Sequence, residues 1–198
     1  IEIGRGLSDT LISDIKNGLC GRIKKFAVVT DSIVEPLYAK GIYEKLILAG
    51  YSADMFVIPE GEKSKTRAMK EFVEEAILGG VVSDLAGFVA GTFGRGVPFI
   101  NYATTLLAAA DASVGGKTAV DTPLATNLIG LFNQPEKVYL DIETWKTLPE
   151  RQLSSGLAET IKHACLADGE MFDYLEKNIE KILVNDKDAC EYIAEHNC

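Results

Sequence analysis

The sequence is poor in the residues from which metal centres and redox sites are most often built. Its 198 residues include two histidines, one tryptophan and four cysteines. The cysteines show neither C-x-x-C spacing nor a companion pair of histidines, which excludes a zinc finger and a dithiol redox motif. They are Cys20, Cys165, Cys190 and Cys198. We interpret them as free thiols in a reducing cytosol.

Long apolar runs and an excess of positive charge are also lacking. No apolar stretch approaches the roughly 18 to 20 residues that span a bilayer, and no charged segment followed by an apolar one opens the chain as in a signal peptide. We therefore expect a cytoplasmic protein that does not enter a membrane. The net charge of -9 argues against nucleic acid as a partner, because such affinity depends on clustered Lys and Arg. A small-molecule partner is expected.

The chain does have apolar material for one full domain and part of another, since 47% of its residues are hydrophobic. Its apolar positions predict strands that alternate with helices. The predicted strands lie at 26–29, 54–58, 97–102 and 138–141, and the predicted helices at 8–19, 37–48 and 64–79. Alternation of this kind predicts a parallel sheet whose ligands bind beyond the carboxyl ends of the strands. The run at 26–29 predicts a strand that is covered on both faces.

Strand signals stop after residue 149. Three further helices are predicted at 154–165, 170–183 and 186–196. We therefore expect an α/β fold with two parts, a parallel-sheet domain over 1–149 and the beginning of a helical domain over 150–198. Because the first residues resemble a strand in mid-course, we also expect a short piece to precede them.

Residues 79–130 are rich in Gly, Ala and Thr, which lets backbones approach closely. The segment opens with Gly79-Gly80 and Asp84, a turn at which a glycine backbone can approach a pyrophosphate. Taken alone, the turn is better explained by a glycine that ends one helix and an Asp84 that caps the next.

Residues 104–118 must be tested against a P-loop, because Gly116-Lys117-Thr118 matches the end of that motif. The test fails, since the first glycine of the motif would be Asp111 and a small-residue helix stands where a strand is required. Lys117 and Asp111 around two glycines can hold an anionic ligand that carries hydroxyl groups. A surface salt bridge beside a flexible turn explains them equally well.

Five blocks occur together in the order and spacing of one enzyme family. They are Gly79-Gly80-x-x-x-Asp84, Thr104-Thr105-Leu106-Leu107-Ala108, Asp111-x-Ser113-Val114-Gly115-Gly116-Lys117-Thr118, Asn127-x-Ile129-Gly130 and Gly156-Leu157-Ala158-Glu159-x-Ile161-Lys162. Through them the chain resembles the 3-dehydroquinate synthases of the sugar-phosphate cyclase superfamily, from about Ile3 through at least Leu183. The resemblance implies a Rossmann-like NAD-binding domain followed by a helical domain, with the substrate between them.

The resemblance also implies which residues form the site. Contacts to NAD are expected from Asp31, Glu62, Lys65, Gly79, Gly80, Asp84, Thr104, Thr105, Lys117, Thr144 and Thr147. Catalytic contacts to a phosphorylated substrate are expected from Arg95, Asp111, Lys117, Asn127 and Lys162. Glu159 is the expected ligand of zinc, or of another divalent metal such as cobalt.

The activity implied is that of a lyase of the shikimate pathway, which leads to chorismate and the aromatic amino acids. In this family NAD oxidises a seven-carbon keto-acid phosphate, phosphate leaves, the NADH formed reduces the product again, and an aldol step closes the ring. Zinc polarises the hydroxyl that is oxidised. Arg95 suits a bidentate grip on phosphate, and Lys117 and Lys162 suit compact negative charge. Whether Asp111 orients a lysine or a substrate hydroxyl stays open.

Several positions depart from the family pattern. Leu78 stands where a third glycine is usual, Thr126 where a lysine generally precedes Asn127, Gln152 where a glutamate is common, and Ala103 where a proline precedes the threonine pair. Together these departures bear on cofactor affinity more than on fold.

The family's other two zinc ligands are histidines in segments that this sequence does not contain. We therefore expect the isolated chain neither to hold zinc tightly nor to turn over substrate. His163 lies four positions after Glu159 on a predicted helix, a spacing that allows a metal pair, but packing is the favoured interpretation. His196 is expected to be solvated.

Other functions remain open beside this one. A different sugar-phosphate cyclase of the same superfamily is one, and a catalytically silent NAD-binding or dimerisation fragment is another. The metal-dependent polyol dehydrogenases share the glycine turn, but their Gly-Thr-Gly-Ser-Glu segment is not found after Thr104-Thr105. A homodimer is expected.

Overall fold

The computed structural model describes residues 1–21, 23–77 and 83–197. Contacts between residues divide the chain into two compact units, and both are discontinuous in sequence. The smaller unit contains Ile1–Leu7, Asn101–Gly115 and Val138–Cys198, and the larger unit contains Ser8–Ile100 and Gly116–Lys137. The three helices after residue 149 thus fall in the same unit as the first seven residues. The domain boundary near residue 149 stays a prediction.

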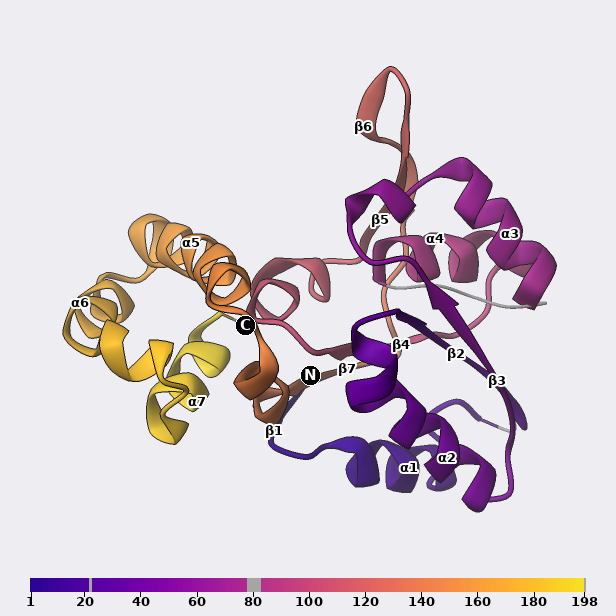
Figure 1. Cartoon of the computed structure of the whole chain (residues 1–198), viewed down its shortest axis with the longest axis horizontal. Coiled ribbons are helices and arrows are strands. Elements are labelled where there is room, and N and C mark those ends of the chain that lie inside the picture. The colour runs from indigo at the N-terminus through magenta and orange to yellow at the C-terminus, as the bar shows by residue number, and fades with distance from the viewer. Residues whose placement is uncertain (22, 78–82, 198) are drawn as a thin grey trace. The chain divides into compact units, whose positions relative to one another are not determined.

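The larger unit begins with helix α1 (Ser8–Lys16) and a parallel pair of strands, β2 (Lys25–Asp31) and β3 (Ser52–Ile58) (Figure 1). The connection between the strands is helical and consists of the π-helical turn η1 (Glu35–Ala39) and α2 (Lys40–Leu48). Both predicted strands and the predicted crossover are confirmed. The predicted cover on both faces of 26–29 is not found, because Phe26, Val28 and Val29 are only half-buried and Ala27 is exposed.

Two more helices and a hairpin complete the larger unit. They are α3 (Arg67–Ile77), α4 (Ser83–Thr92), β5 (Lys117–Thr122) and β6 (Ala125–Phe132), with short 3-10 turns at η2 (Glu62–Ser64) and η3 (Phe93–Arg95). Val73, Val89 and Val120 are fully buried between them. The small residues expected to allow close approach do so at Gly87 and Gly91. A Cβ on Gly87 would lie 2.5 Å from the Thr118 methyl group, and one on Gly91 would lie 2.7 Å from Leu131.

The antiparallel pairing of β5 with β6 was not expected from the sequence. The alternation of helices and strands predicted only parallel pairs, and the Gly, Ala and Thr content of 117–132 hides the alternation by which a strand is normally found. Strand β4 (Ile100–Ala103) also begins later than the predicted 97–102, since Val97 to Phe99 lie outside any strand.

The smaller unit contains a three-stranded sheet in the order β1 (Glu2–Gly4), β7 (Lys137–Asp141), β4, in which β1 and β7 are parallel. After β4 comes the π-helical turn η4 (Ala108–Ala112), and after β7 the 3-10 turn η5 (Ile142–Thr147). The helices α5 (Glu150–Ala167), α6 (Gly169–Leu183) and α7 (Lys187–His196) follow, which confirms the prediction of helices after residue 149. Figure 1 shows them in orange to yellow.

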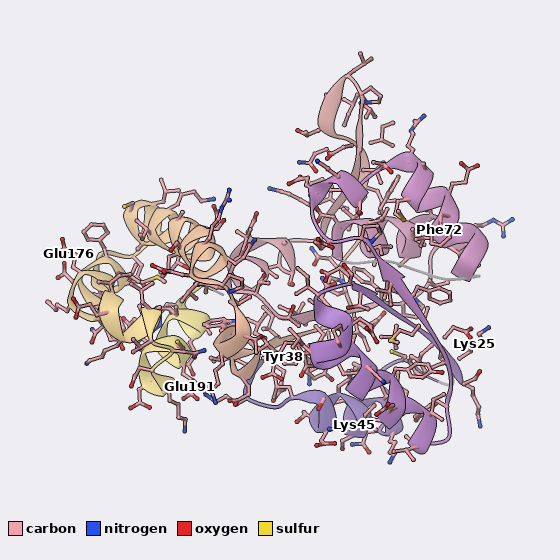
Figure 2. The ribbon with its side chains drawn as sticks, viewed as in Figure 1. Lys25, Tyr38, Lys45, Phe72, Glu176 and Glu191 are labelled. Carbon is pink, nitrogen blue, oxygen red and sulfur yellow. The ribbon has the colours of Figure 1, made fainter. Side chains whose placement is uncertain are left out.

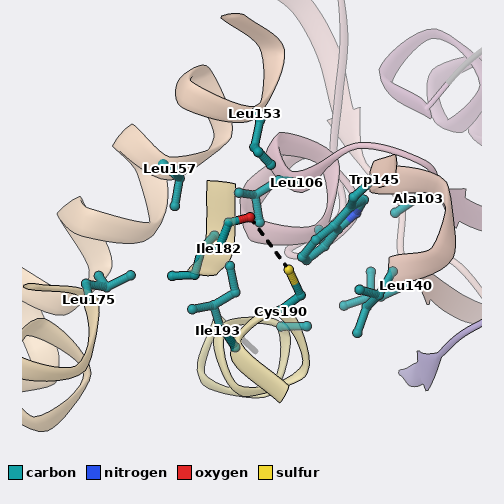
Figure 3. Close-up of a cluster of buried hydrophobic side chains, with 14 of the residues drawn as sticks. Ala103, Leu106, Leu140, Trp145, Leu153, Leu157, Leu175, Ile182, Cys190 and Ile193 are labelled. Carbon is teal, nitrogen blue, oxygen red and sulfur yellow. Dashed lines mark hydrogen bonds between the residues drawn. The ribbon is translucent and has the colours of Figure 1, made fainter. Parts of the chain in front are cut away.

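The core of the smaller unit joins its sheet to these helices (Figure 3). Leu106, Leu140, Ile182 and Ile193 are all fully buried in one apolar cluster. Gly156 allows α5 to approach the start of the helical turn after β4, because a Cβ there would lie 2.7 Å from both Leu106 Cβ and Leu107 N. Gly156, the first residue of the Gly156-Leu157-Ala158-Glu159 block, therefore has a packing role. In the described part of the chain, no helix has both the length and the apolar character needed to cross a membrane.

A buried carboxylate ties the loops of the smaller unit together. Asp141, at the end of β7, is 3% exposed. It accepts hydrogen bonds from the backbone N–H groups of Gly6 (2.8 Å), Leu7 (2.9 Å) and Glu143 (3.1 Å) and from the hydroxyl of Tyr102. The carboxylate thus connects the segment after β1, the strand β4 and the turn η5. Each of these donors needs a buried partner, because an unpaired one is costly.

Replacing Asp141 by Ala leaves these donors without their acceptor. We expect the free energy of unfolding to fall by about 3 kcal/mol or more, from several buried hydrogen bonds to one charged group. Asp168→Ala is the matched control, since Asp168 only caps α6 through the Met171 N–H at 2.9 Å, and we expect it to cost about 1 kcal/mol. Urea denaturation measures both, and an Asp141→Ala loss no larger than the control would contradict this role.

The thiol of Cys190 is predicted to be unreactive in the native protein. Burial raises its pKa to about 11 from 9.0, and its Sγ faces the Ile182 carbonyl oxygen at 3.9 Å (Figure 3). Iodoacetamide at pH 8 should modify the exposed Cys165 and spare Cys190 until the chain is unfolded. Because the folded pKa is raised, the neutral thiol's contribution to stability is complete below pH 9.0 and is lost as the pH rises to about 11. Equal native labelling of the two, measured by mass spectrometry, would refute this.

Candidate functional site

Lys65 is the centre of a polar cluster in the larger unit. It follows β3 through Gly61, whose φ of 89° favours glycine, and through the 3-10 turn η2. Ser64 fixes that turn by donating its hydroxyl to the Pro59 carbonyl oxygen at 2.7 Å. Lys65 therefore sits in the loop beyond the carboxyl end of a parallel strand, which is where ligands bind in α/β sheets.

The Lys65 ammonium contacts two residues from distant parts of the sequence. Its Nζ lies 2.5 Å from Asp84 Oδ2, in the first turn of α4, and donates a hydrogen bond to Asn127 Oδ1 at 2.7 Å. The side chains of Lys65 and Asp84 are 16% and 30% exposed, so solvent screens their attraction only in part. Three of the expected site residues, from three separate segments of the sequence, thus meet in one place.

Asn127 reaches Lys65 from the β5–β6 hairpin in an unusual backbone conformation. Its φ is 53°, a left-handed value that Asn tolerates better than most residues. Its N–H is hydrogen-bonded to Asp121 Oδ1 at 2.7 Å, and the N–H of Asp121 donates to the Lys65 carbonyl oxygen at 2.9 Å. Asp121 was not among the expected site residues, because nothing in the sequence shows that its backbone meets Lys65.

Asp31 and Glu62 lie near strand ends of the same unit, at the positions expected. Asp31 ends β2, and its Oδ1 accepts the N–H groups of Ile33 at 2.8 Å and Val34 at 2.9 Å, so this carboxylate shapes the turn it stands in. Glu62 is exposed in η2. The neighbouring Ser32 donates to Glu60 Oε2 at 2.6 Å, which lowers the pKa of Glu60.

The remaining expected residues of the larger unit are exposed cations or lie outside the described residues. Arg95 is exposed, with φ 73° between Gly94 and Gly96, both also at positive φ. Glycine adopts positive φ without strain, so within this segment only the conformation of Arg95 is uncommon for its residue type. Lys117 is exposed at the first residue of β5. Gly79 and Gly80, together with Leu78, lie outside the residues that the structure describes.

The expected threonines of the smaller unit have structural contacts. Thr144 is 1% exposed, and its hydroxyl lies 3.0 Å from the Thr104 carbonyl oxygen and 2.6 Å from that of Asp141. Thr147 donates its hydroxyl to the Thr144 carbonyl oxygen at 3.0 Å, and Thr105 Oγ1 accepts the Ala108 N–H at 3.0 Å. These hydroxyl contacts explain why threonine suits positions 105, 144 and 147, whereas Thr104 contributes its backbone carbonyl. The expected contacts to nicotinamide stay a prediction.

Asp111 lies exposed on the helical turn η4. The turn widens there, because the Ser113 N–H donates to the Ala108 carbonyl oxygen five residues earlier at 2.9 Å. Wide turns of this kind are often found at functional sites. The predicted small-residue helix in place of a P-loop strand is thereby confirmed.

The expected metal ligand Glu159 lies on α5 with two basic side chains of the same helix. Lys162 contacts Glu159 Oε1, and His163 Nε2 lies 3.6 Å from the same oxygen. Glu159 is 20% exposed and His163 31%. Among the residues described, no group of three His, Cys, Asp or Glu side chains is arranged to hold a metal ion. A carboxylate and an imidazole are fewer than the three protein ligands of a catalytic zinc site.

Comparison with known structures defines the class of fold. The chain is similar to 2-epi-5-epi-valiolone synthase from Streptomyces hygroscopicus, solved with NAD+ and Zn2+, at a TM-score of 0.86 and 23% identity over 98% of this chain and 57% of that one. It is similar to 2-deoxy-scyllo-inosose synthase, solved with carbaglucose-6-phosphate, NAD+ and Co2+, at a TM-score of 0.77 and 20% identity, with 98% and 57% covered. The chain thus has the NAD-binding fold found in sugar-phosphate cyclases and in several dehydrogenases.

Sequence comparison narrows this class to one family. The family model described as 3-dehydroquinate synthase N-terminal matches residues 63–155. The 3-dehydroquinate synthase of Desulforamulus reducens is 47% identical, with 88% of this chain and 53% of that protein covered, and the one from Methylococcus capsulatus is 41% identical, with 100% and 58% covered. The matched part of the chain resembles the 3-dehydroquinate synthases, and the chain spans about half the length of the curated relatives it matches.

The Lys65–Asp84 ion pair should be stronger than a surface pair, which a double-mutant cycle can show. Lys25 and Asp54 form the matched control, 2.8 Å apart with side chains 65% and 48% exposed, and Lys25 projects from the start of β2 (Figure 2). We expect a coupling free energy of about 1–2 kcal/mol for Lys65→Met with Asp84→Asn, against less than about 0.5 kcal/mol for Lys25→Met with Asp54→Asn. Urea denaturation gives both values. Equal coupling would show that Lys65 is not held in place by Asp84.

Proposed function

We propose that the protein is a 3-dehydroquinate synthase, which converts 3-deoxy-D-arabino-heptulosonate 7-phosphate to 3-dehydroquinate and phosphate with the help of NAD and a divalent metal. The observation that carries this proposal is the meeting of Lys65, Asp84 and Asn127. The resemblance names these residues for their contacts to cofactor and substrate, and they come from segments up to 62 positions apart. Identities of 41–47% to curated 3-dehydroquinate synthases support the same function.

The residues of the larger unit suit a dinucleotide. NAD, when bound, supplies a reversible hydride acceptor. The Asp84 carboxylate can accept hydrogen bonds from ribose hydroxyls, and the Lys65 ammonium can donate them. For Asn127 we retain the contact to the substrate that the family implies. Because Lys65 already has two partners, its position is set before a ligand arrives, which lowers the entropic cost of binding.

The substrate phosphate calls for cations that keep their charge. Arg95 presents an exposed guanidinium that can bind phosphate oxygens in a bidentate manner, and Lys117 presents an exposed ammonium at the start of β5. Both residues lie in the larger unit. For Asp111 and Lys162 we retain the substrate contacts that the family implies. Lys162 contacts Glu159 and can hold negative charge there.

Zinc or cobalt is part of the proposal, with Glu159 as one ligand. The described residues do not complete such a site, so we derive no step of the reaction from it. The contact between Lys162 and Glu159 has a consequence for binding, because a cation that took Glu159 Oε1 would compete with the ammonium for that oxygen. We also propose that the protein works as a homodimer.

The alternative is that the protein is a different sugar-phosphate cyclase of the same superfamily. It is favoured by Thr126, which is exposed in the hairpin where the 3-dehydroquinate synthases generally have a lysine beside Asn127. The loss of that positive charge changes the contacts available to an anionic ligand. A fragment that binds NAD without turnover is the other alternative.

The experiment uses the complete gene product and follows phosphate release from the seven-carbon substrate with NAD present. We expect release to require NAD. Asp84→Ala should weaken NAD binding about tenfold or more, the loss typical of hydrogen bonds to a charged group. Asp54→Ala, which removes an exposed carboxylate of the same unit, should leave NAD affinity unchanged. Release only from a different sugar phosphate would favour the alternative cyclase, and an absence of NAD binding by calorimetry would overturn the proposal.

A further inference from the structure

The β5–β6 hairpin contains a bulge at one acidic residue. Val120 pairs with Ile129 and Thr122 pairs with Ala125. Between these pairs β5 has one residue, Asp121, whereas β6 has the three residues Thr126, Asn127 and Leu128. Bulges of this kind interrupt the ladder of backbone hydrogen bonds and turn a side chain in a new direction.

Asp121 closes a circle of three contacts around this bulge. Its N–H donates to the Lys65 carbonyl oxygen at 2.9 Å, and its Oδ1 accepts the Asn127 N–H at 2.7 Å. The Asn127 Oδ1 then accepts from Lys65 Nζ at 2.7 Å. Asp121 therefore donates a hydrogen bond to the backbone of Lys65 and accepts one from the backbone of Asn127. The side chains of Lys65 and Asn127 contact each other.

The conformation of Asn127 depends on an acceptor at this point. A φ of 53° is uncommon outside glycine and persists only where the surroundings fix it. The bulge removes the Asn127 N–H from the regular ladder, and the Asp121 carboxylate supplies the partner that this N–H needs. Without that carboxylate the bulge can relax, and the Asn127 amide is then no longer directed at Lys65.

We propose that Asp121 is a positioning residue of the dinucleotide site, acting through Asn127 on Lys65. This rests on the proposed function, because only there are Lys65 and Asn127 ligand contacts. Asp121 itself touches no ligand in this proposal. Its effect on affinity must therefore disappear when Asn127 is absent.

The test is a set of NAD titrations with the complete gene product. Asp121→Ala should weaken NAD binding about tenfold, whereas Asp121→Asn, which keeps an acceptor oxygen, should stay within about threefold of the unaltered protein. Thr122→Ala is the control in the same hairpin, since it removes the contact of the Thr122 hydroxyl with the Ala125 carbonyl oxygen at 3.1 Å, and it should leave affinity unchanged. In an Asn127→Ala background, adding Asp121→Ala should change affinity less than about twofold.

The outcomes separate this proposal from the proposed function. If the unaltered protein does not bind NAD, the proposed function fails. If it binds NAD and Asp121→Ala binds equally well, or if the loss is equally large without Asn127, the positioning role is overturned, and the second result indicates a general effect on the fold. Amide hydrogen exchange of the unaltered protein gives a test without substitution. Slow exchange of the Asn127 N–H supports the contact with Asp121, and free exchange overturns it.

Discussion

The buried carboxylate of Asp141 is the contact on which the smaller unit depends. β7 ends at this residue, and the carboxylate then accepts hydrogen bonds from the chain after β1, from Tyr102 on β4 and from the start of η5. Three segments that are far apart in sequence are therefore fixed to one charged group. The position of Thr144 follows, because its hydroxyl lies between the carbonyl oxygens of Asp141 and Thr104. Any site that these threonines form therefore requires that Asp141 keep these loops in position.

The larger unit depends on close backbone approach as well as on charge. Gly87 and Gly91 leave room on α4 for the side chains of Thr118 and Leu131, so the β5–β6 hairpin can pack on the helix that carries Asp84. That packing lets Asn127 reach Lys65 while Asp84 reaches the same ammonium. The polar cluster is thus a consequence of where glycine occurs in α4.

The described residues bring together several of the expected cofactor and substrate contacts, but they do not bring together a set of metal ligands. Lys65, expected to contact the cofactor, is in direct contact with both Asp84 and Asn127. The metal-side residue Glu159 has two basic neighbours on its own helix, and both lie within 3.6 Å of one oxygen. A metal ion that bound this oxygen would compete with both neighbours, so its affinity depends on the further ligands that accompany it.

The sequence by itself determined the elements whose apolar period is long and regular: the parallel pair β2 and β3, the crossover helix, and the three helices after residue 149. The resemblance also predicted a set of polar site residues, and three of them, Lys65, Asp84 and Asn127, meet in the structure. The sequence did not reveal the hairpin at 117–132, where small residues hide the alternation of a strand. Nor did it reveal Asp121 and Asp141, whose roles consist of contacts to backbone groups 56 and 135 positions away. Only tertiary structure decides such contacts, because every residue has the same backbone N–H and C=O groups and no side-chain pattern shows which of them will meet.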